Sequence, residues 1–176
     1  MDSTRLAPDA SSNASLAAPS RVLLTTGTDY RAALDSLIQA ARTSIKIFDA
    51  DGVQYELNST RRLESLSTFL RSGSEAKLTM VLRSLEHVEK KCPRFVQLVA
   101  LHSNQVTIRQ TDHEASRLED CLLITDDAHF ARRNVQAHGR GVVVRNDERE
   151  ATPMIERFQQ IIGASTVVSL ATTLGL

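Results

Sequence analysis

Apolar residues recur along this chain with two periods, one typical of helices and the other of strands. Between residues 29 and 42 apolar side chains fall three or four positions apart and charged ones take the opposite face, which predicts an amphipathic helix. The same spacing predicts helices over 60–72 and 153–162. A further helix is expected to begin near Ser84 and to break at Pro93, because proline cannot donate the hydrogen bond that a helix interior needs.

Polar residues mark the expected helix ends. Thr28 and Asp29 stand where the first helix needs a cap, and side-chain oxygens of this kind accept hydrogen bonds from the first free N–H groups. Thr152 is expected to cap the last helix, with Pro153 at its first position and Gly163 at its end.

Shorter apolar or alternating runs predict strands between the helices. These runs cover residues 22–25, 44–49, 77–82, 106–109, 121–124 and 142–144, and one that starts at His129. Two aspartates occupy the turn 126–128, so the strands on either side of it are expected to form a hairpin. The alternation of strands and helices, followed by a hairpin, a strand and a helix, predicts an α/β fold with three α/β/α layers. The sheet is expected to be mixed, because helical crossovers give parallel neighbours and a hairpin gives antiparallel ones.

The length of 176 residues predicts one domain, which we place at residues 21–163. Residues 1–20 are rich in Ser, Ala, Asn and Pro and are expected to form a disordered leader. Residues 164–176 form an apolar, uncharged C-terminal tail, for which a strand, a docking segment and a frayed end stay open.

Charge and cysteine content narrow the class of protein. The 21 basic and 21 acidic residues balance, which argues against non-specific nucleic-acid binding because that needs a basic surface. Cys92 and Cys121 both lie in apolar contexts, as buried cysteines do in a reducing compartment. No apolar run approaches the roughly 20 residues of a membrane span, and no secretory signal is recognisable, so we expect a cytoplasmic protein.

The hairpin carries the first candidate chemistry. Strand alternation places Glu119 and Cys121 on one face, where a carboxylate beside a thiol could serve as an acid–base pair or as part of a metal site. The simpler interpretation is a buried cysteine and a solvated glutamate. Residues able to bind a metal are Asp112, His113, Glu114, Asp126, Asp127, His129 and His138. None of them has a recognised zinc spacing, so we expect neither a metal nor another cofactor.

An anion site is the remaining candidate. Arginines and one amide cluster in the last third of the chain, at Arg117, Arg132, Arg133, Asn134, Arg140 and Arg145. The planar guanidinium suits phosphate or carboxylate. On a strand Arg132 and Arg133 point to opposite faces, so only one of them can join a given site. The alternative is surface charge that pairs with nearby acidic residues.

At the hairpin the chain resembles the phospholipase D-like family, whose motif is His-x-Lys-x-x-x-x-Asp on a strand, followed after a turn by Gly-Ser-x-Asn. The apolar block 122–125 and the following Asp126 match the end of the first motif. Glu119 then takes the histidine position and Cys121 the lysine position, while residues 131–134 correspond loosely to Gly-Ser-x-Asn. The resemblance spans about residues 22–163 and implies the phospholipase D-like version of the three-layer fold.

The replaced motif residues change what the resemblance implies. In the family the histidine attacks phosphorus and the lysine binds phosphate oxygens, and neither Glu119 nor Cys121 can take these roles. We therefore expect a catalytically inactive domain that acts as a binding, regulatory or scaffold module. The pattern is most similar to an uncharacterised, single-repeat bacterial branch that is sometimes attached to acetyltransferase domains. The resemblance thus implies a homodimer, because the family pairs two motifs, and an acetyltransferase domain as a partner.

A second hypothesis is an enzyme with a repurposed cleft that acts on a phosphate-containing or other anionic substrate. Glu119, His113 or His129 would be its acid–base group. Arg117 or Arg132 would hold the anion, with Asn134 beside them. Convergence of Glu119, His129 and an arginine in one concave pocket would favour this hypothesis.

Overall fold

The computed structural model describes residues 18–112, 120–134 and 140–170. Its strands are β1 (Ser20–Leu24), β2 (Ser44–Asp49), β3 (Lys77–Leu82), β4 (Val106–Thr111), β5 (Asp120–Thr125), β6 (His129–Asn134), β7 (Gly141–Arg145) and β8 (Ser165–Val167). Its helices are α1 (Gly27–Ala40), α2 (Thr60–Arg71), α3 (Glu86–Lys91), α4 (Pro93–Leu101) and α5 (Glu148–Gly163), with a short 3-10 helix η1 (Val53–Tyr55) after β2.

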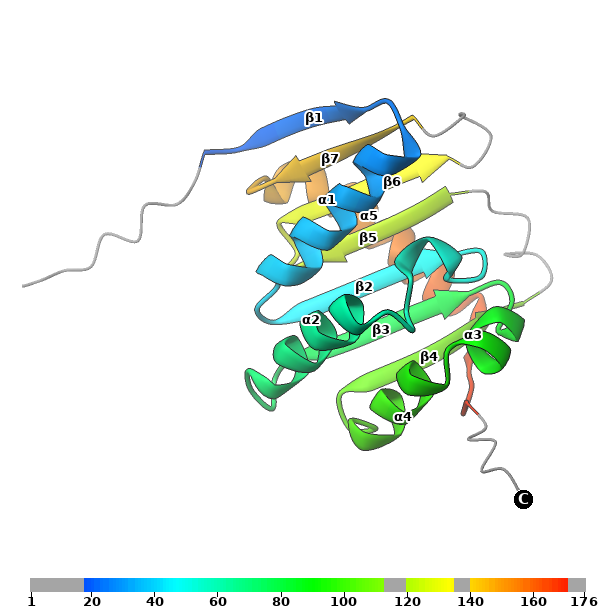
Figure 1. Ribbon diagram of the computed structural model, residues 1–176. Coiled ribbons are helices and arrows are strands. Elements are labelled where there is room, and N and C mark those ends of the chain that lie inside the picture. The colour runs from blue at the N-terminus through cyan, green and yellow to red at the C-terminus, as the bar shows by residue number, and fades with distance from the viewer. Residues whose placement is uncertain (1–17, 113–119, 135–139, 171–176) are drawn as a thin grey trace, which may run out of the picture.

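The strands form one mixed sheet in the order β1-β7-β6-β5-β2-β3-β4-β8. The neighbours β2, β3 and β4 are parallel, and every other pair is antiparallel. Helices α1 to α4 cover one face of the sheet and α5 covers the other (Figure 1). This arrangement confirms the predicted three-layer α/β/α fold and its mixed sheet.

Helix α1 shows why the hydrophobic pattern located the elements well. Its buried residues are those that the spacing predicted, Tyr30, Ala33, Leu34, Leu37 and Ile38. The predicted cap was wrong by two residues, because Thr26 caps the helix and Asp29 is its third residue. The Thr26 hydroxyl accepts from the Asp29 N–H at 3.1 Å and the Asp29 carboxylate accepts from the Thr26 N–H at 3.1 Å, which forms a capping box.

Helix α5 begins earlier than predicted, and Thr152 is not its cap. The cap is Asp147, whose carboxylate accepts from the Glu150 N–H at 3.0 Å. Pro153 therefore lies inside the helix, and the Thr152 hydroxyl donates to the Glu148 carbonyl at 2.8 Å. The extra first turns are held by Ala151, which is fully buried against the sheet.

Both ends of the sheet include residues that the sequence placed outside the domain. Strand β8 pairs antiparallel with β4, so part of the predicted tail is an edge strand. The Arg109 side chain holds this strand, because it donates to the Ser165 hydroxyl at 2.9 Å and to the Ser165 carbonyl at 2.6 Å. At the other end β1 begins at Ser20, while the rest of the predicted leader, residues 1–17, lies outside the described residues. Among the helices that the structure describes, none is both long and apolar enough to cross a bilayer.

Candidate functional site

The turn of the β5–β6 hairpin holds the aspartate that aligns with the family motif. Asp126 and Asp127 have φ angles of 54° and 55°, a left-handed conformation that Asp tolerates better than most residues. The Asp126 carboxylate accepts from the N–H groups of Arg42 at 2.9 Å, Thr43 at 2.8 Å and Ser44 at 3.0 Å. Asp126 therefore holds the connection between α1 and β2 in place, and these hydrogen bonds give its carboxylate a structural role.

These contacts set the charge of the Asp126 side chain. Partial burial alone would raise the pKa of the carboxyl group, but the N–H donors of Thr43, Ser44 and Arg42 outweigh it. The pKa of Asp126 consequently lies below its ordinary value of 3.8. A carboxylate held by several backbone donors is stabilised in its charged form.

Five polar side chains gather at the opposite end of the hairpin, and we call them the edge cluster. They are Tyr30 of α1, Asp49 of β2, Tyr55 of η1, Cys121 of β5 and Arg133 of β6. The sheet register brings them together, since Cys121 pairs with Arg133, and Phe48 pairs with Leu122 so that Asp49 follows beside Cys121. The cluster lies where the parallel strands end, the edge at which α/β sheets place their ligands.

Within the edge cluster, Cys121 is a buried and neutral thiol. Burial, followed by the Asp49 charge and a hydrogen bond to the Asp49 carboxylate, raises the pKa of Cys121 to about 12, although Arg133 opposes this. Cys121 is 2% exposed and Asp49 is 1% exposed. Since the thiolate is the reactive form of cysteine, this thiol is a poor nucleophile.

The other members close the cluster around the thiol. The Arg133 guanidinium carbon lies 4.9 Å from the centre of the Tyr30 ring, a cation–π contact. Besides its hydrogen bond with Cys121, the Asp49 carboxylate accepts from the Gly52 N–H at 2.9 Å. Gly52 has a φ of 78° in this turn. Asp49 and Arg133 therefore place opposite charges on the two sides of Cys121.

Tyr30 and Tyr55 are both fully buried. Burial is the main reason that the pKa of each phenol lies well above 10, so both stay protonated. Their hydroxyl groups are close enough to interact electrostatically, yet among the described residues neither makes a hydrogen bond of good geometry. The edge cluster therefore contains two neutral, buried phenols that interact electrostatically with Asp49.

The residues predicted for an active cleft do not all meet at this edge. His129 pairs with Thr125, four residue pairs along the hairpin from Cys121, which is roughly 13 Å at the usual strand rise. The His129 Nδ1 accepts from the Asn146 N–H at 2.9 Å. His129 thus makes a structural contact at the turn end of the hairpin, far from the edge cluster. Its predicted convergence with Glu119 stays a prediction, because Glu119 lies outside the described residues.

The two neighbouring arginines point to opposite faces, as strand alternation predicted. Arg132 lies on the α5 side, where it pairs with Asp120 at 3.1 Å, and Arg157 of α5 lies 4.0 Å from the same carboxylate. The arginine in the edge cluster is therefore Arg133 and not Arg132. Asn134 is exposed at the end of β6, opposite Asp120. His113, Arg117 and Glu119 lie outside the described residues.

Sequence reasoning identified Cys121 as a motif position, but it missed Tyr30 and Tyr55 as site residues. Tyr30 matched the apolar face of a helix, and nothing in the sequence near Tyr55 indicated that its ring would reach the hairpin. In the parts of the chain that the structure describes, no three potential metal ligands come together. The possible ligands His113, Glu114 and His138 lie outside those parts.

The mixed sheet with its hairpin and closing helix defines the class of protein, because solved structures of the phospholipase D fold superpose on it. Nuc from Salmonella typhimurium, a phospholipase D family member, matches with a TM-score of 0.62 and 16% identity, over 86% of this chain and 99% of that one. The chain belongs to the family described as Domain of unknown function (DUF7931), which matches residues 26–169.

Two further structures show how widely this fold is used. TrmBL2, an archaeal chromatin protein with a novel mode of DNA binding, has a TM-score of 0.62 and 15% identity over 84% of this chain and 54% of its own. Phosphatidylserine synthase from Haemophilus influenzae Rd KW20 has a TM-score of 0.59 and 14% identity over 90% of this chain and 41% of its own. No curated protein matches the sequence. At these identities the likeness shows the fold alone, and it confirms that the chain has the phospholipase D-like architecture.

Proposed function

We propose that this chain is a phospholipase D-like domain without phosphodiesterase chemistry, which acts as a binding, regulatory or scaffold module. The observation that carries the proposal is the closed environment of Cys121. At the position that aligns with the motif lysine, the side chain is a buried, neutral thiol that is hydrogen-bonded to Asp49 and lies beside Arg133, whose guanidinium covers the Tyr30 ring.

Phosphate binding at this position requires a positive charge that faces the phosphate oxygens. Cys121 supplies none, and the Asp49 carboxylate beside it would repel a phosphate. Arg133 does carry a positive charge, but its guanidinium lies over the Tyr30 ring and next to the Asp49–Cys121 pair. The cluster is therefore close to neutral and filled, which disfavours a phosphodiester at this edge.

The nucleophile position supports the same proposal from the sequence. Glu119 aligns with the motif histidine, and strand alternation predicts that it shares the face of Cys121. A carboxylate cannot form a phosphohistidine, and its negative charge disfavours phosphate. Asp126, the motif residue that the chain keeps, has a structural task that is sufficient to explain it.

The partners that we propose follow from the family resemblance. They are a second copy of the chain and an acetyltransferase domain, in the cytoplasm of a bacterial cell. TrmBL2 supports the use of this fold for binding, since it is a chromatin protein with a novel mode of DNA binding. The balanced charge of the present chain favours a partner other than bulk nucleic acid.

Hydrolysis of bis-p-nitrophenyl phosphate by the purified chain tests the proposal. We expect no release of p-nitrophenolate above that of buffer, and no difference between the wild type and Glu119→Gln. Turnover that Glu119→Gln abolishes would overturn the proposal, because it would show that the edge still performs chemistry on a phosphodiester.

A further inference from the structure

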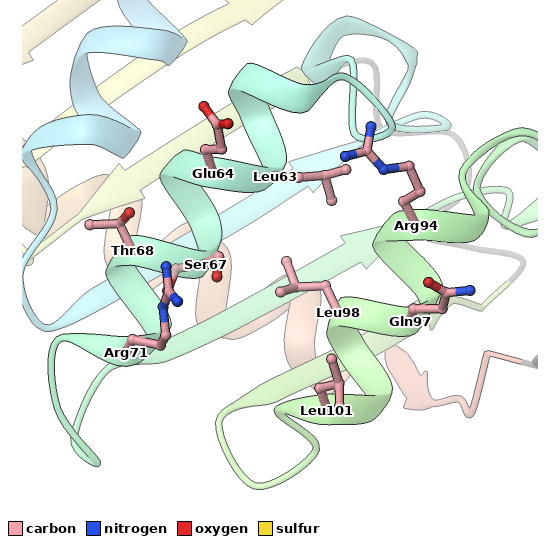
Figure 2. Close-up of a pocket in the computed structure, with 9 residues that line it drawn as sticks. All are labelled: Leu63, Glu64, Ser67, Thr68, Arg71, Arg94, Gln97, Leu98 and Leu101. Carbon is pink, nitrogen blue, oxygen red and sulfur yellow. The ribbon is translucent and has the colours of Figure 1, made fainter.

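The helical layer carries an open groove that is separate from the edge cluster. The groove lies between α2 and α4 and has a volume of about 550 Å³ (Figure 2). Its floor is formed by Leu63 and Leu98, which are each 8% exposed. Leu101 is 80% exposed beside this floor, so the apolar lining of the groove continues to the surface.

The two ends of the groove carry positive charge. Arg94 lies at the end near Leu63, and Arg71 lies at the other end (Figure 2). The Arg94 Nη1 donates to the Thr60 hydroxyl at 3.2 Å, and the Arg71 Nε donates to a carbonyl of its own helix at 3.3 Å. Within the described residues, neither arginine takes part in an ion pair. A guanidinium has five N–H donors, so each of these arginines can still donate hydrogen bonds to a carboxylate of a partner.

We infer that this groove is a docking site for an amphipathic helix of a partner protein, with apolar residues along one face and acidic residues at both ends. Leu63, Leu98 and Leu101 offer an apolar strip that suits side chains at positions i, i+4 and i+7 of such a helix. Carboxylates at the ends of the helix would meet Arg71 and Arg94. The lining arginines outnumber Glu64, the acidic residue of the rim, so the charge of the groove favours an acidic partner.

A helix fits this surface better than the other occupants do. The space between two neighbouring helices forms a trough that accepts a third helix by ridges-into-grooves packing. Residues 171–176 of this chain have no charged side chain, so they offer no acidic side chains for the arginines. A second copy would offer, among the described helices, the same groove with the same two arginines, because the other apolar helix faces pack on the sheet. Like charges would then face each other across the contact.

This inference rests on the proposed function only in that it assigns the module a binding surface. The groove shares no residue with the edge cluster. The hydrolysis result and the groove result can therefore fail separately: phosphodiester turnover bears on the edge cluster alone, and helix binding bears on α2 and α4 alone.

Selection from a displayed library of helical peptides, with the full chain as the immobilised target, tests the inference. We expect enriched peptides to carry apolar residues at i, i+4 and i+7 and Asp or Glu at both ends. Leu101→Ser should weaken the best peptide about 10-fold or more, since it removes a leucine from the contact. Leu23→Ser is the matched control, because Leu23 is 73% exposed on β1, away from the groove, and this variant should bind as the wild type does.

A charge reversal completes the design. The double variant Arg71→Glu and Arg94→Glu should lose the acidic peptides and prefer peptides with Lys at both ends, provided that its melting temperature stays near that of the wild type. The inference is overturned if no peptide is enriched, if the enriched ends are neutral or basic, or if Leu101→Ser binds as well as Leu23→Ser. It is also overturned if Leu101→Ser abolishes self-association of the chain in light scattering, or if peptides bind only after residues 171–176 are removed, because the groove would then belong to a second copy or to the chain's own end.

Discussion

The Cys121 thiol lies between the charges of Asp49 and Arg133 and is buried, so it should react slowly with thiol reagents. Burial and the neighbouring Asp49 raise the pKa of Cys121 to about 12, and burial raises that of Cys92 as well. We expect neither cysteine of the folded chain to react with dithionitrobenzoate at mildly basic pH, because a buried protonated thiol is inert. Both should react when the chain is unfolded in guanidinium chloride, which serves as the control. Rapid labelling of the folded chain would contradict the closed environment of Cys121.

Asp126 should contribute to stability through the backbone donors that it binds. Replacement by Asn keeps the tolerance for a left-handed φ but weakens the contacts to Arg42, Thr43 and Ser44, so we expect a loss of about 1–2 kcal/mol in the free energy of unfolding. Asp127→Asn is the matched control in the same turn. The Asp127 side chain is more exposed, and within the described ranges it pairs with Lys46, so the loss should be at most about 0.5 kcal/mol. Denaturant titration measures both values.

The stabilisation by Asp126 should depend on pH in a defined direction. Its pKa in the folded chain lies below the ordinary value of 3.8, so the charged form is favoured by folding. The contribution is fully present well above pH 3.8 and is lost as the pH falls through the lower, folded-state pKa. The stability difference between wild type and Asp126→Asn should therefore be constant near neutral pH and shrink in acid. A difference that grows in acid would show that another group causes it.

Among the secondary-structure elements, the start of α5 provides the clearest test of a corrected boundary. Asp147 caps this helix, whereas Thr152 lies inside it. Asp147→Ala should cost about 1 kcal/mol, the usual value for a lost N-cap. Thr152→Ala should change the stability by no more than about 0.5 kcal/mol, because alanine is favoured inside a helix. A larger loss of stability for Thr152→Ala than for Asp147→Ala would contradict Asp147 as the cap and favour the predicted cap, Thr152.

Hydrophobic spacing located most elements because burial on the sheet selects one face of each helix and strand. The apolar face of α1 and the strands β2 and β3 were predicted with their observed residues. Helix starts were less accurate, since several capping residues stand close together and the backbone geometry decides between them. Strand β8 was left open because a run of three residues has no period, and Arg109 of a distant strand holds it in place.

The candidate site could be predicted only where it lies within the hairpin. The alternation of Arg132 and Arg133 and the turn position of Asp126 are local properties of two strands, and the structure agrees with them. The edge cluster combines these strands with Tyr30, which comes from a helix about 90 residues earlier in the chain, so no local pattern contains it. The contacts of Asp126 with the α1–β2 connection likewise appear only when the chain is folded.

On the scale of the whole molecule, the edge cluster and the proposed docking groove lie in different places. The edge cluster lies at the strand ends of the central sheet, whereas the groove lies in the helical layer between α2 and α4 (Figures 1 and 2). The chain keeps the architecture of the phospholipase D fold, and the edge cluster is part of its core. The binding that we propose uses a different surface, in the helical layer.

The rate at which the full chain hydrolyses a simple phosphodiester tests this account most directly. Release of p-nitrophenolate from bis-p-nitrophenyl phosphate should be the same for the wild type, Glu119→Gln and Cys121→Ser, and equal to that of the heat-denatured protein. This result is expected at mildly acidic as well as mildly basic pH, because the described part of the edge holds a protonated thiol at Cys121 and an Arg133 whose guanidinium already lies over Tyr30. Saturable turnover by the wild type that either substitution removes would contradict the central claim.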